Sequence, residues 1–209
     1  MPRLAEPLNT AEEYLALERA ADHKSELVNG RIYAMTGASM PHNQIVLNVS
    51  AELRARLRGR PCRVFANDMR VKVARTGMYT YPDVVALCEP PRLEDSHLDT
   101  LLNPAVIIAV LSPSTHAYDR GEKFAHYRTI ESLREYILVA QDHTRIERYV
   151  RRGEQWVLHK ITDPAGVLPI ETLGCEIPVG EIYDRVGVPR RRTRSLAPLR
   201  SMTEGSGAD

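Results

Sequence analysis

The residues that decide the fold of this 209-residue chain lie between Tyr81 and Tyr127. This stretch begins with YPDVVAL (81–87), crosses a proline- and acid-rich loop, and continues as IIAVLSPST (107–115) and DRGEKFAHY (119–127). The run AVIIAVL (105–111) has no polar residue, which predicts a strand buried on both faces of a central sheet. The same run is far shorter than the ~20 residues of a membrane-spanning helix. Asp83 stands at the start of a second buried strand.

Helix and hairpin signals precede this stretch. Thr10 and Glu13 have the spacing of a capping box and predict the start of a first helix. Asn29-Gly30 joins two short β-prone runs and predicts a tight hairpin. Pro41 opens a second helix, whose apolar residues recur every fourth position, at Ile45, Val49, Leu53 and Leu57.

The second half of the chain reads as a helix followed by strands. Asp119 and Glu122 predict the capped start of a third helix that ends near Ser132. Strands are expected at 135–140, 144–152 and 154–161, the last two joined as a hairpin through Arg152-Gly153. The order of elements indicates an α/β (α+β) fold with a mixed central sheet, flanking helices and additional β-hairpins. Residues 1–188 are expected to form one domain, and 189–209 a basic, disordered tail.

Composition restricts the possible partners. Lys and Arg number 28 against 27 for Asp and Glu, so any nucleic-acid surface must be local. Arginines cluster at 54–60, near Arg151 and at 189–194. The three cysteines, at positions 62, 88 and 175, show no CxxC spacing and are expected to be reduced thiols. No signal peptide or membrane span is predicted, so a cytoplasmic location is expected.

Several polar side chains are candidates for phosphodiester chemistry. Asp83 offers an oxygen ligand for a divalent cation, but a turn or capping aspartate is the more ordinary interpretation of that residue alone. Lys123 and Glu26 are, by themselves, typical of a solvated lysine and a strand-end charge. His42 is favoured as a helix-start polar residue. Ser112, Ser114 and Thr115 are suited to bind phosphate or to form a turn.

Six segments in fixed order resemble the Uma family of restriction endonucleases, which is related to the PD-(D/E)xK nuclease superfamily. The resemblance covers about residues 10–185, and its segments are ELVNGRIYAMT (26–36), PHNQI (41–45), YPDVV (81–85), VLSPST (110–115), DRGEKFAHY (119–127) and EYILV (135–139). The combination of YPD, VLSPST and DRGEK is specific, whereas any one of these pieces is weak. The resemblance implies a restriction-endonuclease-like fold.

The resemblance also implies roles for individual residues. Asp83 matches the first carboxylate of the site, and Glu26 matches the N-terminal acidic residue. The second metal-binding carboxylate is expected at the position of Ala109, with the backbone carbonyl of Val110 as a further ligand. Lys123 matches a lysine that substitutes for the superfamily lysine, whose own position here is Leu111.

The implied activity is hydrolysis of DNA by an endonuclease that depends on Mg²⁺ or Mn²⁺. Loss of the carboxylate at 109 raises the barrier by about 3–5 kcal/mol, or roughly 10²–10⁴-fold in rate, so the chain is expected to be impaired or inactive. The intact surroundings favour a recent or engineered change over long decay. The alternative is a non-catalytic DNA-binding or interaction module. DNA is the expected partner, a homodimer is possible, and no membrane association is expected.

Overall fold

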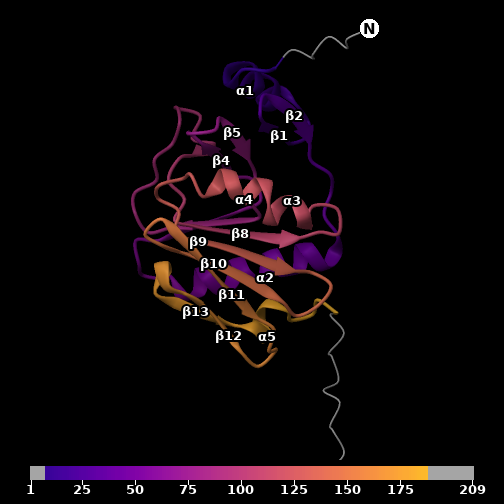
Figure 1. Ribbon diagram of the computed structural model, residues 1–209, viewed down its shortest axis with the longest axis vertical. Coiled ribbons are helices and arrows are strands. Elements are labelled where there is room, and N and C mark those ends of the chain that lie inside the picture. The colour runs from indigo at the N-terminus through magenta and orange to yellow at the C-terminus, as the bar shows by residue number, and fades with distance from the viewer. Residues whose placement is uncertain (1–7, 188–209) are drawn as a thin grey trace, which may run out of the picture.

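The computed structural model describes residues 8–187, and Figure 1 shows them as two sheets with helices against them. Five strands form one sheet in the order β2-β1-β5-β4-β7, and six form the other in the order β11-β10-β9-β8-β6-β3. Strands β12 and β13 make a separate pair. This mixed α+β architecture confirms the predicted fold class. The tail from 189 onward lies outside the described residues.

The helices and strands have these bounds: α1 Ala11–Ala20, β1 Ser25–Val28, β2 Arg31–Ala34, α2 Met40–Arg56, β3 Arg63–Ala66, β4 Arg70–Val73, β5 Met78–Thr80, β6 Val84–Leu87, β7 Thr100–Leu101, β8 Val106–Leu111, α3 His116–Arg120, α4 Glu122–Tyr127, β9 Glu135–Ala140, β10 Ile146–Arg152, β11 Gln155–Ile161, β12 Val167–Ile170, the 3-10 helix η1 Glu171–Leu173, β13 Cys175–Pro178 and α5 Val179–Ile182.

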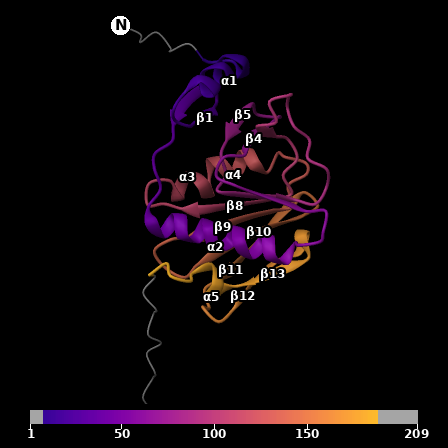
Figure 2. The ribbon, with the colours of Figure 1, turned by 180° about the vertical axis from the view of Figure 1, so that it is seen from behind.

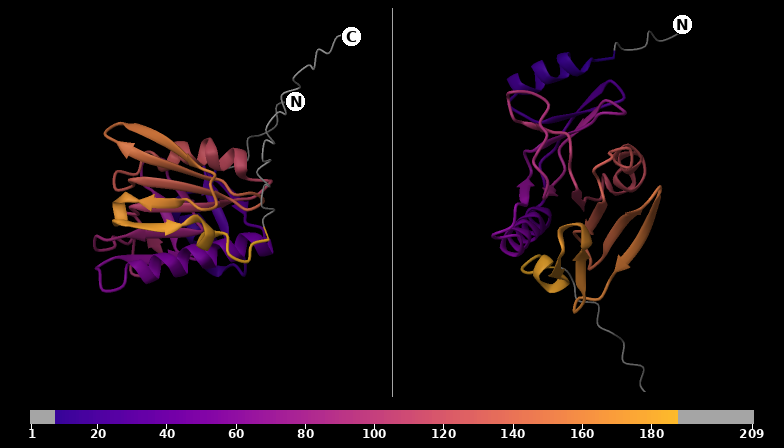
Figure 3. Two further views of the ribbon diagram at one scale, coloured as in Figure 1. Left: turned by 90° about the horizontal axis from the view of Figure 1, so that it is seen from below. Right: turned by 90° about the vertical axis from the view of Figure 1, so that its left-hand side faces the viewer.

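The six-stranded sheet has β8 near its centre. Strand β8 pairs in parallel with β9 and antiparallel with β6, and every residue of β8 is buried. Helix α2 packs on one face of this sheet, where Ile45, Val49 and Leu53 meet alternate residues of β6, β8 and β9. Helix α4 packs on the other face through Phe124 and Tyr127. Figures 2 and 3 show α2 on the side of the sheet opposite α3 and α4. A continuous apolar strand is the expected result of burial on both faces.

The five-stranded sheet begins with the predicted hairpin. Strands β1 and β2 are antiparallel, and the turn between them places Asn29 at φ 50° and Gly30 at φ 77°. Asparagine and glycine tolerate these angles better than other residues, which explains the sequence signal. Helix α1 begins at the predicted capping box, with Thr10 accepting from the backbone N–H of Glu13 at 3.2 Å.

The third helix differs from its prediction. The segment forms two short helices, α3 and α4, separated at Gly121, whose φ and ψ of −104° and −94° interrupt the helical path. Asp119 lies inside α3 instead of capping a helix, and α4 ends at Tyr127 instead of near Ser132. A three-residue spacing of Asp and Glu also fits a helix interior, so the capping-box pattern was misleading here.

The prediction of three reduced thiols is wrong. Cys62 and Cys88 form a disulfide, and Cys175 is the free cysteine among the described residues. Strands β3 and β6 are antiparallel neighbours with Arg63 opposite Leu87, so the next pair outward along the ladder is Cys62 and Cys88. Such a pairing depends on sheet register, which linear spacing of cysteines does not reveal.

None of the helices in residues 8–187 combines the length and the apolar character that crossing a lipid bilayer requires.

Candidate functional site

Asp83 and Ala109 are cross-strand neighbours. Strands β6 and β8 are hydrogen-bonded, with Val84 opposite Ile108. Because the pairing is antiparallel, the residue before Val84 faces the residue after Ile108, and these are Asp83 and Ala109. Ala109 is 8% exposed. The methyl group of Ala109 therefore lies beside the carboxylate of Asp83, where the sheet is almost completely covered from solvent.

The carboxylate of Asp83 is held from two sides. Its Oδ2 accepts a hydrogen bond from the backbone N–H of Val110 at 2.7 Å, and its Oδ1 lies 2.8 Å from Nε2 of His42. His42 sits in the first turn of α2, where its backbone N–H is capped by Ser39. The sequence suggested the carbonyl of Val110 as a metal ligand, whereas the observed contact uses its amide.

Glu26 and Lys123 form a second pair. Nζ of Lys123 donates to Oε1 of Glu26 at 2.8 Å, across 97 residues of sequence. The same oxygen accepts from the backbone N–H of Tyr81 at 3.1 Å and from the hydroxyl of Thr80. Glu26 thus connects β1, the segment entering β6, and α4. The side chains of Lys123 and Glu26 are only 12% and 11% exposed.

Charge around Lys123 keeps it protonated. Burial alone lowers the pKa of Lys123, but the neighbouring Tyr127, Glu26 and Asp119 outweigh burial, and the net pKa is well above its usual value. An ammonium group in this position can stabilise negative charge on a phosphate oxygen. It cannot act as a general base near neutral pH, because it does not give up its proton there.

Asp119 is a buried carboxylate close to both pairs. Burial is the main cause that raises the pKa of Asp119. The charges of Asp83 and Glu26 raise it further, while Lys123 and a hydrogen bond with Thr115 oppose the shift. Asp119 therefore lies within electrostatic reach of Asp83 on one side and of Glu26 and Lys123 on the other.

The orientation of Ala109 points it toward α4. Ala109 belongs to the same core cluster as Phe124 and Tyr127, which flank Lys123 in α4. Strands β6 and β8 are direct neighbours, so Asp83 and Ala109 lie on adjacent strands. That Asp83, Ala109, Lys123 and Glu26 line a single cleft stays a prediction.

The hydroxyl-rich turn after β8 is internally bonded. Oγ of Ser112 contacts Oγ of Ser114 at 3.0 Å and Oγ1 of Thr115 at 2.9 Å, and it accepts from the backbone N–H of Thr115 at 3.1 Å. The three hydroxyl groups therefore form hydrogen bonds within the turn and stabilise it.

Two residues of the site carried no decisive signal in the sequence. The sequence favours His42 as a helix-start residue, yet its ring contacts the carboxylate of Asp83. The sequence favours Asp119 as a helix cap, yet it is buried and within electrostatic reach of Asp83, Glu26 and Lys123. His42 lies in the segment PHNQI and Asp119 in the segment DRGEKFAHY, and both segments support the family resemblance. Membership of these segments is therefore the signal that could have identified the two residues.

The donor set does not fit a complete site for a hard divalent cation. Mg²⁺ and Mn²⁺ favour several oxygen ligands. Ala109 supplies none, and the oxygens of Asp83 already face His42 and the amide of Val110. Across residues 8–187, no group of three or more histidine, cysteine or carboxylate side chains is arranged to hold a metal ion.

The fold of this chain is shared with a protein of known structure. It is similar to a solved structure described as the "crystal structure of a putative nuclease belonging to DUF820 from Anabaena variabilis ATCC 29413". The TM-score is 0.70, and the match covers 85% of this chain and 98% of the other. At 17% sequence identity, this likeness concerns the fold alone.

The chain belongs to the Uma2 family, whose description is "putative restriction endonuclease", and the family match covers residues 11–180. Two relatives come from Synechocystis sp. (strain ATCC 27184 / PCC 6803 / Kazusa). The "uncharacterized protein sll1609" is 39% identical over 153 residues, which cover 73% of this chain and 86% of the relative. The "uncharacterized protein slr1290" is 33% identical over 180 residues, which cover 85% of this chain and 92% of the relative.

Proposed function

We propose that this protein is a DNA-binding member of the restriction-endonuclease class whose Mg²⁺- or Mn²⁺-dependent phosphodiester hydrolysis is impaired. The observation that carries the proposal is the register of β6 and β8, which puts Ala109 directly beside Asp83. A carboxylate at 109 would stand next to that of Asp83 and face the helix that carries Lys123. Family membership and fold support the class of the reaction.

The missing carboxylate at position 109 affects the hydrolytic step most directly. Metal-assisted hydrolysis needs a cation held firmly enough to polarise phosphate and to acidify a water molecule. With one carboxylate missing, we expect a barrier higher by about 3–5 kcal/mol, which corresponds to roughly 10²–10⁴-fold in rate at 1.36 kcal/mol per decade.

The remaining residues still suit a phosphate group. Lys123 keeps a positive charge in a partly desolvated place, where its attraction to a phosphate oxygen is stronger than in water. The Asp83 carboxylate fixes the orientation of the His42 ring. Lys123 and His42 are the groups suited to contact phosphate, and neither replaces the oxygen ligand missing at 109.

The substitution Ala109→Glu tests the proposal. We expect the variant to cut plasmid DNA in the presence of Mg²⁺ or Mn²⁺ and to be inactive in EDTA. Ala109→Gln is the matched control, because glutamine has nearly the same shape without the charge. The double variant Ala109→Glu, Asp83→Ala is expected to be inactive, because one carboxylate cannot fix the cation.

A second readout separates metal binding from chemistry. Ligand binding to the native state raises stability by RT ln(1 + [L]/Kd). Mg²⁺ at 100 times Kd therefore raises the free energy of unfolding of Ala109→Glu by about 2.7 kcal/mol and leaves that of Ala109→Gln almost unchanged. A folded, metal-binding Ala109→Glu protein that cuts neither DNA nor RNA would rule out the nuclease proposal.

The second candidate function is a non-catalytic DNA-binding module on the same fold. A pocket lined by Arg54, Arg58, Arg60 and Arg63 favours it. This alternative predicts salt-sensitive DNA binding with no cleavage by either the wild-type protein or Ala109→Glu.

Assembly and location remain predictions. Light scattering of the purified protein would distinguish a homodimer from a monomer. The expected cytoplasmic location contrasts with the disulfide between Cys62 and Cys88, because disulfides are rare in that compartment.

A further inference from the structure

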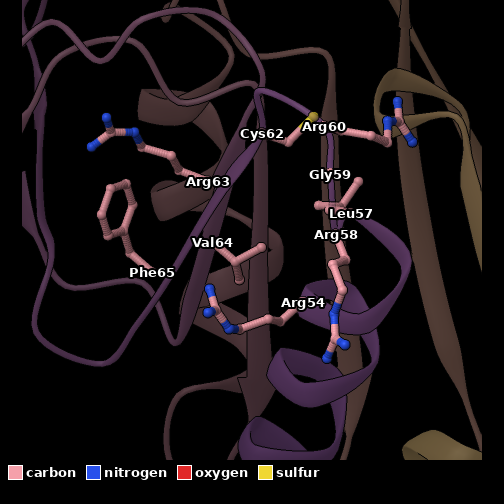
Figure 4. A pocket seen from close by; sticks show the side chains of 9 residues that line it. All are labelled: Arg54, Leu57, Arg58, Gly59, Arg60, Cys62, Arg63, Val64 and Phe65. Carbon is pink, nitrogen blue, oxygen red and sulfur yellow. The ribbon is translucent and has the colours of Figure 1, made fainter.

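A pocket rich in arginine lies where α2 ends and β3 begins. Its volume is about 460 Å³, and the residues that line it include Arg54, Arg58, Arg60, Arg63 and Phe65. Figure 4 shows guanidinium groups contributed by the helix, by the turn after it and by the strand. We call this site the arginine pocket.

The local chain path brings these arginines together. Arg54 lies in the last turn of α2, and the chain then reverses through Gly59, whose φ of +77° suits glycine and few other residues. After the reversal, the disulfide of Cys62 with Cys88 joins the start of β3 to the end of β6. The turn that carries Arg58 and Arg60 is therefore anchored at both ends.

The positive charge of the pocket is not balanced by nearby carboxylates. Within residues 8–187, no ion pair involves Arg54, Arg58, Arg60 or Arg63. Arg56 is a useful contrast, because it projects elsewhere and pairs with Glu52. Arg60 donates to the carbonyl of Gly174 at 3.4 Å, which leaves its charge uncompensated.

Helix-end electrostatics explain only part of this arrangement. The negative end of the α2 dipole favours a cation such as Arg54 in the last turn. Arg60 and Arg63 lie beyond the helix, where this effect has decayed. Four arginines line one pocket of a chain whose net charge is only +1, so positive charge is concentrated there, and a bound anion would offset it.

We propose that the arginine pocket binds phosphate groups of a nucleic-acid strand. Guanidinium groups recognise phosphate oxygens through paired hydrogen bonds, and Phe65 adds an aromatic ring for a sugar or base to pack against. The choice of nucleic acid as the source of phosphate rests on the proposed function. The presence of an anion site rests on the arginines alone.

The pocket is separate from the candidate site. His42, which contacts Asp83, lies in the first turn of α2, and Arg54 follows 12 residues later. At 1.5 Å per residue this is about 18 Å along the helix axis. Removing arginines at one end of α2 therefore leaves the contacts of His42 and Asp83 at the other end in place.

The test compares two double variants with the same loss of charge. Arg58→Ala, Arg63→Ala removes two pocket arginines, and Arg31→Ala, Arg75→Ala removes two exposed arginines that have no ion pair among the described residues. Affinity for a fluorescent 20-base-pair duplex and for the matching single strand is measured by anisotropy over a range of KCl concentrations. Thermal melting checks that both variants fold.

We expect the pocket variant to bind at least about tenfold more weakly at low salt. We also expect its slope of log affinity against log salt on the duplex to fall by roughly 1–2, near 0.9 for each lost phosphate contact. The control variant should behave like the wild type. Arg58→Lys, Arg63→Lys keeps the charge and should give intermediate affinity, because lysine lacks the planar fork.

Competition with inorganic triphosphate distinguishes the source of the phosphate. Displacement of the oligonucleotide only at high triphosphate concentration supports a strand as the ligand. If triphosphate saturates the pocket at a lower concentration than the oligonucleotide does, a nucleic-acid strand is not the ligand, and the pocket binds a small phosphate compound instead. Equal binding of nucleic acid by the wild type and the pocket variant, or no binding by either, overturns the proposal entirely.

Failure of this inference can be told apart from failure of the proposed function. If Ala109→Glu cuts DNA while the pocket variant binds like the wild type, only the pocket inference fails. If Ala109→Glu never cuts but the pocket variant loses affinity, hydrolysis fails and the pocket stands.

Discussion

Lys123 and Glu26 show how much the candidate site depends on a single ion pair. Both side chains are mostly buried, and their charged atoms lie 2.8 Å apart. Removing one member of a buried pair leaves the other charge without compensation, which is generally more costly than removing both. The pair therefore holds the site together as well as placing a charge within it.

The variant Lys123→Met tests this dependence. We expect it to lower the free energy of unfolding by about 3 kcal/mol, because Glu26 is left buried without its cation. Glu26→Gln, Lys123→Met is expected to recover part of the loss, since glutamine still accepts from Thr80 and Tyr81. Urea unfolding of the wild type, Lys123→Met, Glu26→Gln and the double variant gives the coupling energy. A double variant less stable than Lys123→Met would contradict this account.

Asp119 makes stability depend on pH in a stated direction. Burial raises the pKa of Asp119 in the folded protein above its unfolded value of about 3.8. A carboxyl with a raised folded pKa contributes most below its unfolded pKa, and its contribution is lost as pH rises through the folded pKa. Asp119→Asn cannot ionise, so its stability relative to wild type should increase between pH 4 and pH 7.

Denaturant unfolding at both pH values measures this difference. If the stability of Asp119→Asn relative to wild type stays constant or falls between pH 4 and pH 7, the charge of Asp119 is not disfavoured by folding.

The residue scale also shows where sequence information ends. The resemblance of whole segments to a family identifies Asp83, Glu26 and Lys123 as candidate site residues. The same resemblance shows that a carboxylate is missing at the position of Ala109. The contact of His42 with Asp83 joins residues 41 positions apart. Such a contact follows from how α2 is placed against β6, which no local pattern encodes.

At the scale of helices and strands, the sequence predicts correctly those elements whose structure depends on interactions between neighbouring residues. The Asn29-Gly30 hairpin, the capping box of α1, the apolar face of α2 and the buried strand β8 all match their predictions. The split between α3 and α4 was missed because one glycine conformation determines it. The division of strands between two sheets was missed because β3 and β4, close in sequence, pair with different partners.

The disulfide gives a testable consequence for β3, an edge strand. Cys62 and Cys88 are 26 residues apart in sequence. A crosslink closing a loop of this length stabilises a protein by about 3 kcal/mol when loop entropy is the main term. We expect Cys62→Ser, Cys88→Ser to lose roughly that amount under oxidising conditions, and to lose nothing further when a reductant is added.

Calorimetry with and without reductant measures the effect, and mass spectrometry of the alkylated protein establishes which thiols are free. Cys175→Ser is the matched control: it keeps the Cys62–Cys88 disulfide, so it is expected to lose on reduction the same stability as the wild type. Wild-type protein whose three cysteines all react with the alkylating reagent before reduction would contradict the disulfide.

At the scale of the whole molecule, charge is unevenly divided along the chain. Residues 189–209 contain five arginines, one glutamate and one aspartate, a net charge of 5 − 2 = +3, so residues 1–188 carry +1 − 3 = −2. Removing 189–209 therefore reverses the sign of the net charge. We expect truncation to weaken DNA binding and to flatten its salt dependence, with little change in melting temperature.

Anisotropy titrations and thermal melting of the full-length and 1–188 proteins measure both effects. A variant with the five tail arginines replaced by glutamine separates charge from chain length. A large drop in melting temperature on truncation would mean that these residues contribute to the folded domain.

The bond between Glu26 and Lys123 also sets an order of events during protein synthesis. Its two residues are separated by 97 positions. At about 5–20 residues per second, the ribosome adds that length in roughly 5–20 seconds. Throughout this interval Lys123 has not been synthesised, so Glu26 lacks its ion-pair partner. The β1–β2 hairpin can form early from neighbouring residues, but the enclosure around Glu26 closes late. A nascent chain released before Lys123 therefore carries the hairpin without the lysine that pairs with Glu26, and the proposed site is incomplete in it.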